Sequence, residues 1–487
     1  MEYIDVHEAA EKWMLTERRV TTLCRTGRIE GAVKEGNLWR IPKTALKPMD
    51  GRIRDSLAKK YAAVQRPLPI GVSDFKETVT NYYYVDKTLL IKDFLDARPK
   101  VSLFTRPRRF GKTLTMDMLR VFFEKSDEDT SVYFQDKKIW ACGDKYRKYQ
   151  GKYPVIFLTF KDVKFETWEE TLEKLSAVFQ VEYSRHKELL DSPQCNDFEK
   201  RYYRTIISGS ASNVELTEAL ANLSAMLHEH YGVAPILIID EYDTPVQQGY
   251  MLGYYEKVIL FMRNLFSGGF KDNPHLSFGL MTGILRVAKE SIFSGMNNLK
   301  VNSILDNRYS EYFGFTSDEV KPMADYYGRP EKYDELCEWY DGYSFGTSEI
   351  FNPWSVINYL DNDCYPQAFW QSTGNNEIIR DIIAGATSEI KDNLQLLMQG
   401  KHISTYVDTS VIYPEIKSNP SSIYSFLLIA GYLKVVEKEN CHDGNAICDV
   451  AIPNKEIFYV YEKEILSGLS EMISPSSAIA IQQAIIK

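Results

Sequence analysis

Four short apolar stretches alternate with long helical patterns between residues 67 and 315. They are VSLF at 101–104, PVIFLTF at 154–160, ILIID at 236–240 and LSFGLMTG at 276–283. Strands that alternate with helices form parallel sheets, because each crossover helix packs on a face of the sheet as it returns the chain to the starting edge. The sequence therefore predicts an α/β fold with a parallel sheet and helices on both faces.

The segment TRPRRFGKT joins the first of these strands to a helical pattern. It ends in Gly111, Lys112 and Thr113, as does the phosphate-loop pattern G-x-x-x-x-G-K-[ST], but Arg106 stands at the first glycine of that pattern. A loop before a helix N-terminus presents N–H groups to a phosphate, and Arg106 removes none of these donors. We expect Lys112 to reach the phosphates and Thr113 to bind Mg²⁺. The expected nucleotide-binding residues are Arg108, Arg109, Phe110, Gly111, Lys112, Thr113 and Leu114.

Acidic residues follow a second apolar strand. In PILIIDEYDTP a buried strand would bring Asp240 to the Mg²⁺ beside Lys112, and Glu241 would polarise an attacking water as general base. The alternative is a strand end with two solvated acids, which the upstream loop makes less attractive. At the end of the next strand, Thr282 is placed to sense the γ-phosphate. Arg286, four residues on, either contacts the nucleotide of its own or a neighbouring chain or lies on the surface.

The first 46 residues have a different character. Residues 1–60 hold 13 Lys and Arg against 9 Asp and Glu, whereas the whole chain has a net charge of −9. Two helical patterns, the second with Thr16 at its N-cap, precede two β-type runs about a Gly36-Asn37 turn. This order predicts a winged helix-turn-helix over 1–46, similar to excisionase or MerR-like domains. A basic helix face with a basic wing favours DNA as partner over a solvated or protein-docking face. The expected DNA-binding residues are Arg18, Arg19, Thr22, Arg25, Lys34 and Arg40.

The remaining segments carry less chemistry. We expect a linker at 47–66, an inserted helical segment at 162–232 within the ATPase core at 67–315, and a helical lid without strands at 316–385. Residues 386–487 read as a winged-helix-like region without a basic face, for a protein partner or self-association.

Several function classes are excluded by composition. Seven scattered cysteines indicate reduced thiols, and neither cysteines nor histidines form a metal-site pattern. No apolar run approaches the ~18 residues of a membrane helix, and the N-terminus is not a signal peptide. We therefore expect a cytoplasmic protein with no membrane association.

Motifs in a fixed order identify a family resemblance. The chain contains, in this order, PLPIGVSDF, YYYVDKT, TRPRRFGKTL, LIIDEYDTPV, LMTGILRVAKESIFSGMNNL, YFGF, WYDGYSFG, IFNPWSV and FWQSTGNNE. These motifs, over roughly residues 67 to 460, resemble the bacterial AAA-ATPase-like family, which is similar to STAND-type P-loop ATPases. The resemblance implies a RecA/AAA-type P-loop sheet, a helical lid, and binding and hydrolysis of ATP.

The same resemblance assigns roles residue by residue. It implies that Lys112 and Thr113 contact phosphate and Mg²⁺ and that Asp240 binds the Mg²⁺. Glu241 would be the catalytic acid, and Asp243, in the same motif, would support these residues without contacting the nucleotide. Members of the family are commonly joined to a PD-(D/E)xK nuclease-like domain. We find no D…E-x-K arrangement after Pro453, and we therefore predict no nuclease activity for this chain.

The sequence as a whole predicts an ATPase that works as a nucleotide-driven switch and binds DNA through its first domain. Three alternatives stay open: an ATP-gated scaffold with little turnover, a transcription regulator whose ATPase only senses, and the regulatory part of a nuclease whose catalytic domain is absent here.

Overall fold

The structure is a computed structural model of the whole chain. It describes residues 3–13, 15–26, 29, 31–36, 38–43, 45, 65–286, 292–293, 296–370, 387–416, 419–441 and 445–472. The chain divides into two compact units, residues 1–66 and 67–487. The finer boundaries expected within the second unit stay predictions.

The first unit contains two helices and a small antiparallel sheet. Helices α1 (Val6–Trp13) and α2 (Glu17–Arg25) pack beside strands β1 (Tyr3–Ile4), β2 (Val33–Glu35) and β3 (Leu38–Pro42), in the order β1-β3-β2. Ala9, Trp13, Val20, Leu23 and Ile41 form the core. Thr16 caps α2, as the sequence predicts, by accepting a hydrogen bond from the backbone N–H of Arg19. The order helix, helix, hairpin is the expected one, whereas Gly27 and Asn37 lie outside the described residues.

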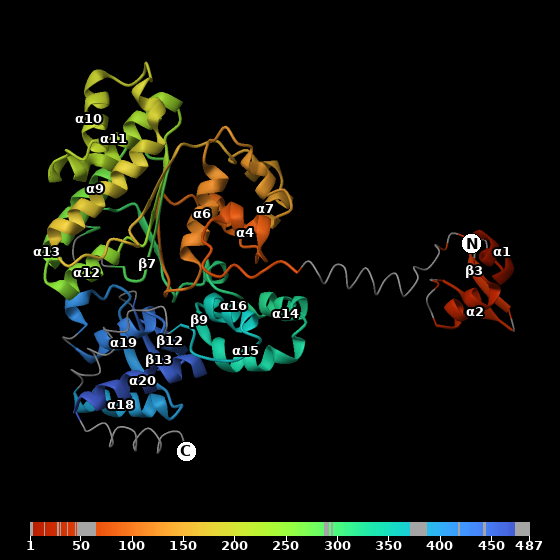
Figure 1. Cartoon of the computed structure of the whole chain (residues 1–487). Helices are drawn as coiled ribbons and strands as arrows, with labels where there is room; N and C mark the ends of the chain where they lie inside the picture. The colour runs from red at the N-terminus through yellow and green to blue at the C-terminus, as the bar shows by residue number, and fades with distance from the viewer. Residues whose placement is uncertain are drawn as a thin grey trace. The chain divides into compact units, whose positions relative to one another are not determined.

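A five-stranded parallel sheet forms the centre of the second unit (Figure 1). Its strands are β4 (Val101–Thr105), β5 (Val155–Thr159), β6 (Ile236–Asp240), β7 (Phe278–Gly283) and β8 (Leu299–Asn302), in the order β5-β6-β7-β4-β8. Every residue of β4 and β6 is buried, as expected for strands covered on both faces. The predicted α/β fold with a parallel sheet is confirmed.

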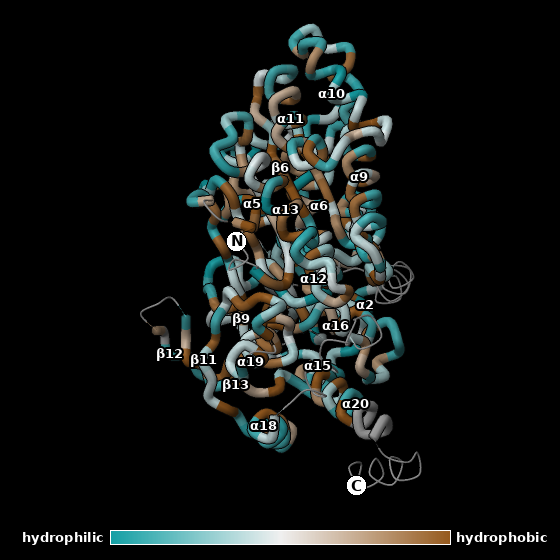
Figure 2. The backbone as a smooth tube through the Cα atoms, turned by 90° about the vertical axis from the view of Figure 1, so that its left-hand side faces the viewer, coloured by the Kyte–Doolittle hydropathy of each residue, from teal (hydrophilic) through white to brown (hydrophobic). Residues whose placement is uncertain are grey.

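Helices cover both faces of this sheet (Figure 1). On one side lie α4 (Phe75–Asn81), α5 (Leu89–Ala97), α6 (Lys112–Phe123), α7 (Lys138–Ala141) and the adjoining α8 (Asp144–Arg147). On the other lie α9 (Trp168–Arg185), α10 (Asp197–Ile207), α11 (Asn213–Tyr231), α12 (Thr244–Leu252) and α13 (Tyr255–Phe270). In Figure 2, hydrophobic segments gather around β6 and α13, while α10 is largely hydrophilic.

The segment 162–232 is helical, as predicted. Its three helices α9, α10 and α11 each begin with a capping box, in which the N-cap side chain and a glutamate three residues on exchange hydrogen bonds with the backbone. Capping boxes satisfy N–H groups that the first turn leaves unpaired, so the local sequence fixes where each helix starts.

The expected lid is not purely helical. It contains α14 (Ser317–Tyr326), α15 (Tyr333–Tyr340) and α16 (Pro353–Asp361), but also an antiparallel hairpin of β9 (Tyr343–Phe345) and β10 (Ser348–Ile350). The expectation that strands are absent here was wrong, because each strand has three residues, too few to show a periodicity. The turn between them uses Gly346 at φ 56°. Residues 371–386, which hold most of FWQSTGNNE, lie outside the described residues.

The C-terminal region has the predicted helix followed by a hairpin. Helix α19 (Pro420–Ile429) precedes β12 (Lys434–Asn440) and β13 (Ala446–Ala451), and β11 (Ile403–Val407) completes the sheet in the order β11-β13-β12. Helices α18 (Ser388–Met398) and α20 (Lys455–Met472) flank these elements. Residues 473–487 lie outside the described residues. No helix in the described ranges is both long enough and apolar enough to cross a membrane.

Candidate nucleotide-binding site

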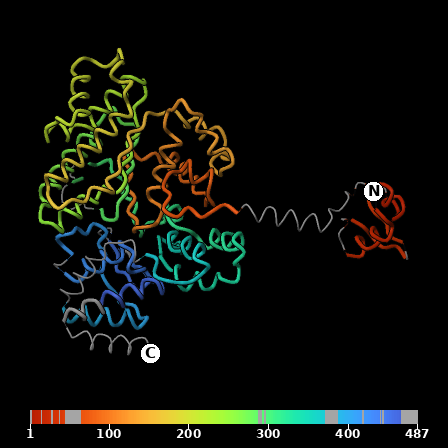
Figure 3. Tube along the Cα trace, in the orientation of Figure 1, coloured from red at the N-terminus to blue at the C-terminus, as the bar shows by residue number. Residues whose placement is uncertain are grey.

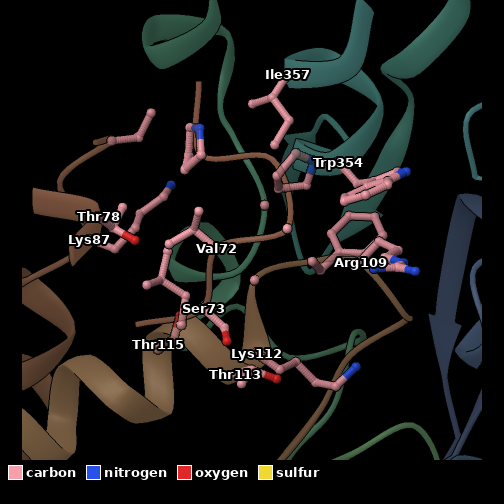
Figure 4. Close-up of a pocket in the computed structure, with 18 of the residues that line it drawn as sticks. Val72, Ser73, Thr78, Lys87, Arg109, Lys112, Thr113, Thr115, Trp354 and Ile357 are labelled. Carbon is pink, nitrogen blue, oxygen red and sulfur yellow. The ribbon is translucent and has the colours of Figure 1, made fainter. Parts of the chain in front are cut away.

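A pocket of about 500 Å³ opens beside the N-terminus of α6. The loop after β4, the segment before α5 and the first turn of α16 meet there, and Figure 3 shows the lid segment running beside the early part of the second unit. Figure 4 shows side chains from all three segments around the opening. Residues that line it include Val72, Ser73, Tyr83, Lys87, Arg109, Gly111, Lys112, Thr113, Trp354 and Ile357 from these segments, together with Glu241 after β6 and Met323 on α14.

The loop after β4 has the shape of an anion site. Gly111 adopts φ 77° and α6 begins at the next residue, so a helix N-terminus opens into the pocket without a side-chain cap. Arg109 also has a left-handed backbone, with φ 70°, a conformation that L-residues other than glycine rarely adopt. Unpaired N–H groups and the helix dipole at such an end favour a phosphate. The geometry is therefore that of a phosphate-binding loop.

Lys112 folds back onto its own loop. Its ammonium group donates hydrogen bonds to the carbonyl oxygens of Pro107 at 2.9 Å and Arg106 at 3.2 Å. The side chain is buried, and burial lowers the pKa of Lys112, although Glu241 and Asp243 oppose that shift. An incoming phosphate offers this ammonium a charged acceptor, which forms a stronger hydrogen bond than a neutral carbonyl.

Two hydroxyl groups hold the carboxylate of Asp240. Thr113 donates to one oxygen at 2.7 Å, and Thr282 donates to the other at 2.5 Å. Burial raises the pKa of Asp240, and the neighbouring Glu241 adds to the effect, while both threonines and Lys112 oppose it. The structure thus brings together the predicted metal-binding residues: Thr113 lies in the first turn of α6, which follows β4, and Asp240 ends β6, two positions from β4 in the sheet.

These residues fit a magnesium ion. A hydroxyl and a carboxylate beside a phosphate loop supply hard oxygen ligands, and Mg²⁺ in nucleotide sites takes its other ligands from phosphates and waters. The described part of the chain holds no group of three or more His, Cys, Asp or Glu residues that could bind a metal by itself. Thr113 and Asp240 would accordingly bind the ion together with a nucleotide.

Glu241 lies at the edge of the same pocket with a strained backbone. Its φ is 52°, its N–H donates to the hydroxyl of Thr282 at 3.3 Å, and Thr244 donates to its carboxylate at 3.4 Å. Left-handed backbone in a non-glycine residue concentrates at functional sites, where the surrounding structure enforces it. This position suits the role of general base that the sequence predicts.

The structure does not bring every predicted residue into the pocket. Thr282 contacts Asp240 rather than the opening, and Arg286 does not line it. The carboxylate of Asp243 accepts hydrogen bonds from the backbone N–H groups of Ile284 and Leu285 at 2.8 and 3.0 Å. Asp243 therefore fixes the segment after β7. The roles proposed for Thr282 and Arg286 toward the γ-phosphate stay predictions.

Arg106 explains the departure from the loop pattern. Its side chain is fully buried and points away from the pocket, donating to the carbonyl oxygens of Asn302 at 2.9 Å and Tyr309 at 3.2 Å. Its guanidinium lies over the rings of Phe313 and Phe345, at 5.2 and 5.3 Å. Burial lowers the pKa of Arg106 to about 10. The backbone of Arg106 is not left-handed, so this loop needs no glycine there.

The other arginines and the apolar residue of the loop have distinct surroundings. Arg108 donates to the side chain of Gln247 on α12 at 2.7 Å, and Arg109 stacks on the ring of Trp354. Phe110 packs against Tyr343 of the lid hairpin. All three line the pocket, as does Leu114.

Motif analysis missed the lid and entry side of the pocket. Val72, Tyr83, Lys87, Met323, Trp354 and Ile357 line it but were not assigned a role. The motifs PLPIGVSDF, YYYVDKT and IFNPWSV carried the available signal, since most of these residues lie within them. Their shared location depends on tertiary contacts between segments more than 200 residues apart.

In the first unit, the predicted DNA-binding residues lie on the surface. Arg18, Thr22 and Arg25 follow one another along one face of α2, and the two arginines are exposed. Lys34 on β2 is exposed, and Arg40 on β3 forms an exposed ion pair with Glu35 at 3.3 Å. Arg19 is exposed beside them. Their role in binding DNA stays a prediction.

Two sequence comparisons with known proteins bear on the function of this part of the chain. Residues 69–293 match the family model AAA-ATPase-like, described as a predicted AAA-ATPase. A protein of Azotobacter chroococcum mcd 1, described as an uncharacterized protein in the vnfD 5' region, is 25% identical over 327 residues. That match covers 66% of this chain and 56% of the relative, so the chain spans little more than half the length of the relative.

Proposed function

We propose that this chain, whose residues 69–293 match the AAA-ATPase-like family model, binds Mg²⁺-ATP in the pocket beside α6 and hydrolyses it. On this proposal the protein is cytoplasmic and works as a switch that is driven by the nucleotide. One observation carries the proposal: the phosphate-type loop at Lys112 and the acidic pair Asp240 and Glu241 meet at one end of the parallel sheet.

Phosphate binding would begin with Lys112. Its ammonium would exchange the carbonyl oxygens of Pro107 and Arg106 for phosphate oxygens, and the first N–H groups of α6 would donate to the same phosphates. Arg109 adds a second positive charge at the rim of the pocket. These groups act by position and charge, since phosphoryl transfer requires little covalent chemistry from the protein.

Hydrolysis would depend on the carboxylates. Bound Mg²⁺ supplies neutralising charge at the phosphates, and Thr113 and Asp240 would hold it. Glu241 would accept a proton from, or orient, the attacking water, because its side chain lines the pocket. Thr282 keeps Asp240 and the backbone of Glu241 in a fixed relation through its single hydroxyl.

Steady-state hydrolysis of ATP by the full chain tests this proposal. We expect phosphate release that requires Mg²⁺ and is lost in Lys112→Ala. Lys271→Ala is the matched control, since Lys271 is an exposed lysine at the end of α13. Tight binding of ATP without hydrolysis would instead indicate that the chain is an ATP-gated scaffold. No binding at all would overturn the nucleotide site itself.

We propose DNA as the partner of the first unit. What supports this is the exposed face of α2 with Arg18, Thr22 and Arg25, together with Lys34 on the adjoining hairpin. A helix of this kind reads base edges in the major groove while cations on the wing contact phosphates. The C-terminal region is proposed to contact a protein partner or a second copy. Stimulation of ATP hydrolysis by duplex DNA would link the two units.

A further inference from the structure

Two neighbouring residues at the start of α16 point to different parts of the second unit. Asn352 caps the helix by accepting hydrogen bonds from the N–H groups of Trp354 at 3.0 Å and Ser355 at 3.4 Å. Trp354 lines the pocket, whereas the hydroxyl of Ser355 donates to the carboxylate of Glu456 on α20. This single helical turn therefore contacts both the phosphate loop and the C-terminal region.

On the pocket side, Trp354 contacts Arg109. The guanidinium of Arg109 lies 4.4 Å from the centre of the indole ring, and Figure 4 shows both side chains on the same side of the pocket. Arg109 is exposed at the pocket, yet partial desolvation by its neighbours lowers its pKa, while Glu241 opposes the shift. The indole ring is one of the contacts that hold this positive charge at the pocket.

On the other side, Glu456 holds Trp354 by two routes. The carboxylate of Glu456 is fully buried and accepts from the hydroxyl of Ser355 at 2.8 and 2.9 Å. It also accepts from the backbone N–H of Trp370 at 2.9 Å. The neighbouring carbonyl of Phe369 accepts from the indole N–H of Trp354 at 3.3 Å. One route fixes the helical turn that carries the indole, and the other fixes the acceptor of the indole N–H.

We propose that Glu456 is a positioning residue for the phosphate site: it fixes Trp354, and Trp354 holds the guanidinium of Arg109 toward the phosphates of the bound nucleotide. The C-terminal region thereby sets part of the affinity for the nucleotide. A partner that moved α20 would change that affinity. This inference rests on the proposed ATP site and deepens it.

A double-mutant cycle on the full chain tests the first link. Binding of ATP and of inorganic tripolyphosphate is measured by calorimetry for the parent, Trp354→Ala, Arg109→Ala and the double variant. We expect Trp354→Ala to weaken tripolyphosphate binding about two- to thirty-fold, the size of a cation–π contact, and to have no further effect once Arg109 is alanine. Trp140→Ala is the matched control, since the guanidinium of Arg147 lies 5.3 Å from the centre of the Trp140 ring, outside the pocket.

Ser355→Ala and Glu456→Gln test the second link. Each is expected to weaken tripolyphosphate binding in the same direction, and only while Trp354 is present. An effect of Trp354→Ala on ATP but none on tripolyphosphate would overturn the proposal, because the indole would then act on the base. Additive effects of Trp354 and Arg109 would also overturn it. A parent chain that binds neither ligand would refute the ATP site itself, which is a separate outcome.

Discussion

The surface of the first unit and the pocket of the second unit use charge in opposite ways. Arg18 and Arg25 are exposed and lie on one helix, so their arrangement follows from the spacing of neighbouring residues. Lys112 and Asp240 are buried, lie 128 positions apart in the chain and are held by named partners. Exposed charges cost little to change, whereas a buried charge depends on every group that compensates it. Substitutions of the exposed charges should therefore have small effects on stability, whereas substitutions of the buried charges should also disturb the groups that compensate them.

The largest effect is expected at Glu241. Glu241→Gln keeps the shape of the side chain and removes its basicity, so the turnover number for ATP should fall about 100- to 10,000-fold, the range of general base catalysis. Binding of ATP should persist. Steady-state phosphate release and equilibrium binding measure the two quantities separately. Glu173→Gln, at an exposed position of α9, serves as the control, and equal turnover in both variants would remove Glu241 from the mechanism.

Arg106 is a buried cation that does not line the pocket, so its substitution tests the effect of burial apart from any contact with the nucleotide. Arg106→Met would leave the carbonyl oxygens of Asn302 and Tyr309 without their donor. The free energy of unfolding should drop by about 3 kcal/mol, the cost of unsatisfied buried acceptors. Denaturant unfolding without nucleotide measures it. The exposed Arg201→Met on α10 should change the free energy by less than about 0.5 kcal/mol. A similar, small effect of both would mean that Arg106 does not anchor the loop.

The buried carboxyl group of Glu456 should make the free energy of unfolding depend on pH. Burial raises the pKa of Glu456 from 4.5 to about 8, and Tyr340 and Tyr343 are the titratable groups that face it. The folded chain therefore retains a proton that the unfolded chain releases, so the stabilisation is complete below pH 4.5 and is lost as pH rises to about 8. The free energy of unfolding should fall by about 1.4 kcal/mol per pH unit within this window, relative to Glu456→Gln. Equal slopes for the parent and the variant would contradict the buried, protonated state.

The smallest effect on stability is expected in the first unit. Arg25→Ala should weaken binding to duplex DNA and lower the slope of log affinity against log salt by about 1, as for the loss of one phosphate contact. The unfolding free energy should change by less than about 0.5 kcal/mol. Titrations at several salt concentrations measure the slope. Lys12→Ala, on α1, is the control, and an unchanged slope in Arg25→Ala would remove this face from the interface.

Local patterns predicted most of the fold. The strands β4 to β7, the capped helices of 162–232 and the C-terminal hairpin follow from apolar runs, capping residues and turn residues that are adjacent in the chain. The strands β9 and β10 escaped prediction because three residues each carry no periodicity, and their pairing depends on Gly346 and on packing against Phe110.

The residues of the candidate site also divide into those that local patterns predict and those that only tertiary contacts bring to the pocket. The positions of Lys112, Thr113, Asp240 and Glu241 could be predicted, because the first two follow β4 after one loop and the others lie at the end of β6. The carboxyl ends of parallel strands share one edge of the sheet. The lid side, with Trp354 and its contact to Arg109, could not be predicted. Neither residue type nor spacing indicates that α16 approaches the loop. The buried, structural role of Arg106 was also invisible, since an arginine in a phosphate loop reads first as a phosphate ligand.

The nucleotide site is best tested by calorimetric titration of the full chain with Mg²⁺-ATP, with Lys112→Ala as the test variant and Lys271→Ala as the control. We expect saturable binding of one nucleotide per chain, which Lys112→Ala abolishes and Lys271→Ala leaves intact. Absence of binding in the parent, or binding that Lys112→Ala does not change, would contradict a nucleotide site at the N-terminus of α6.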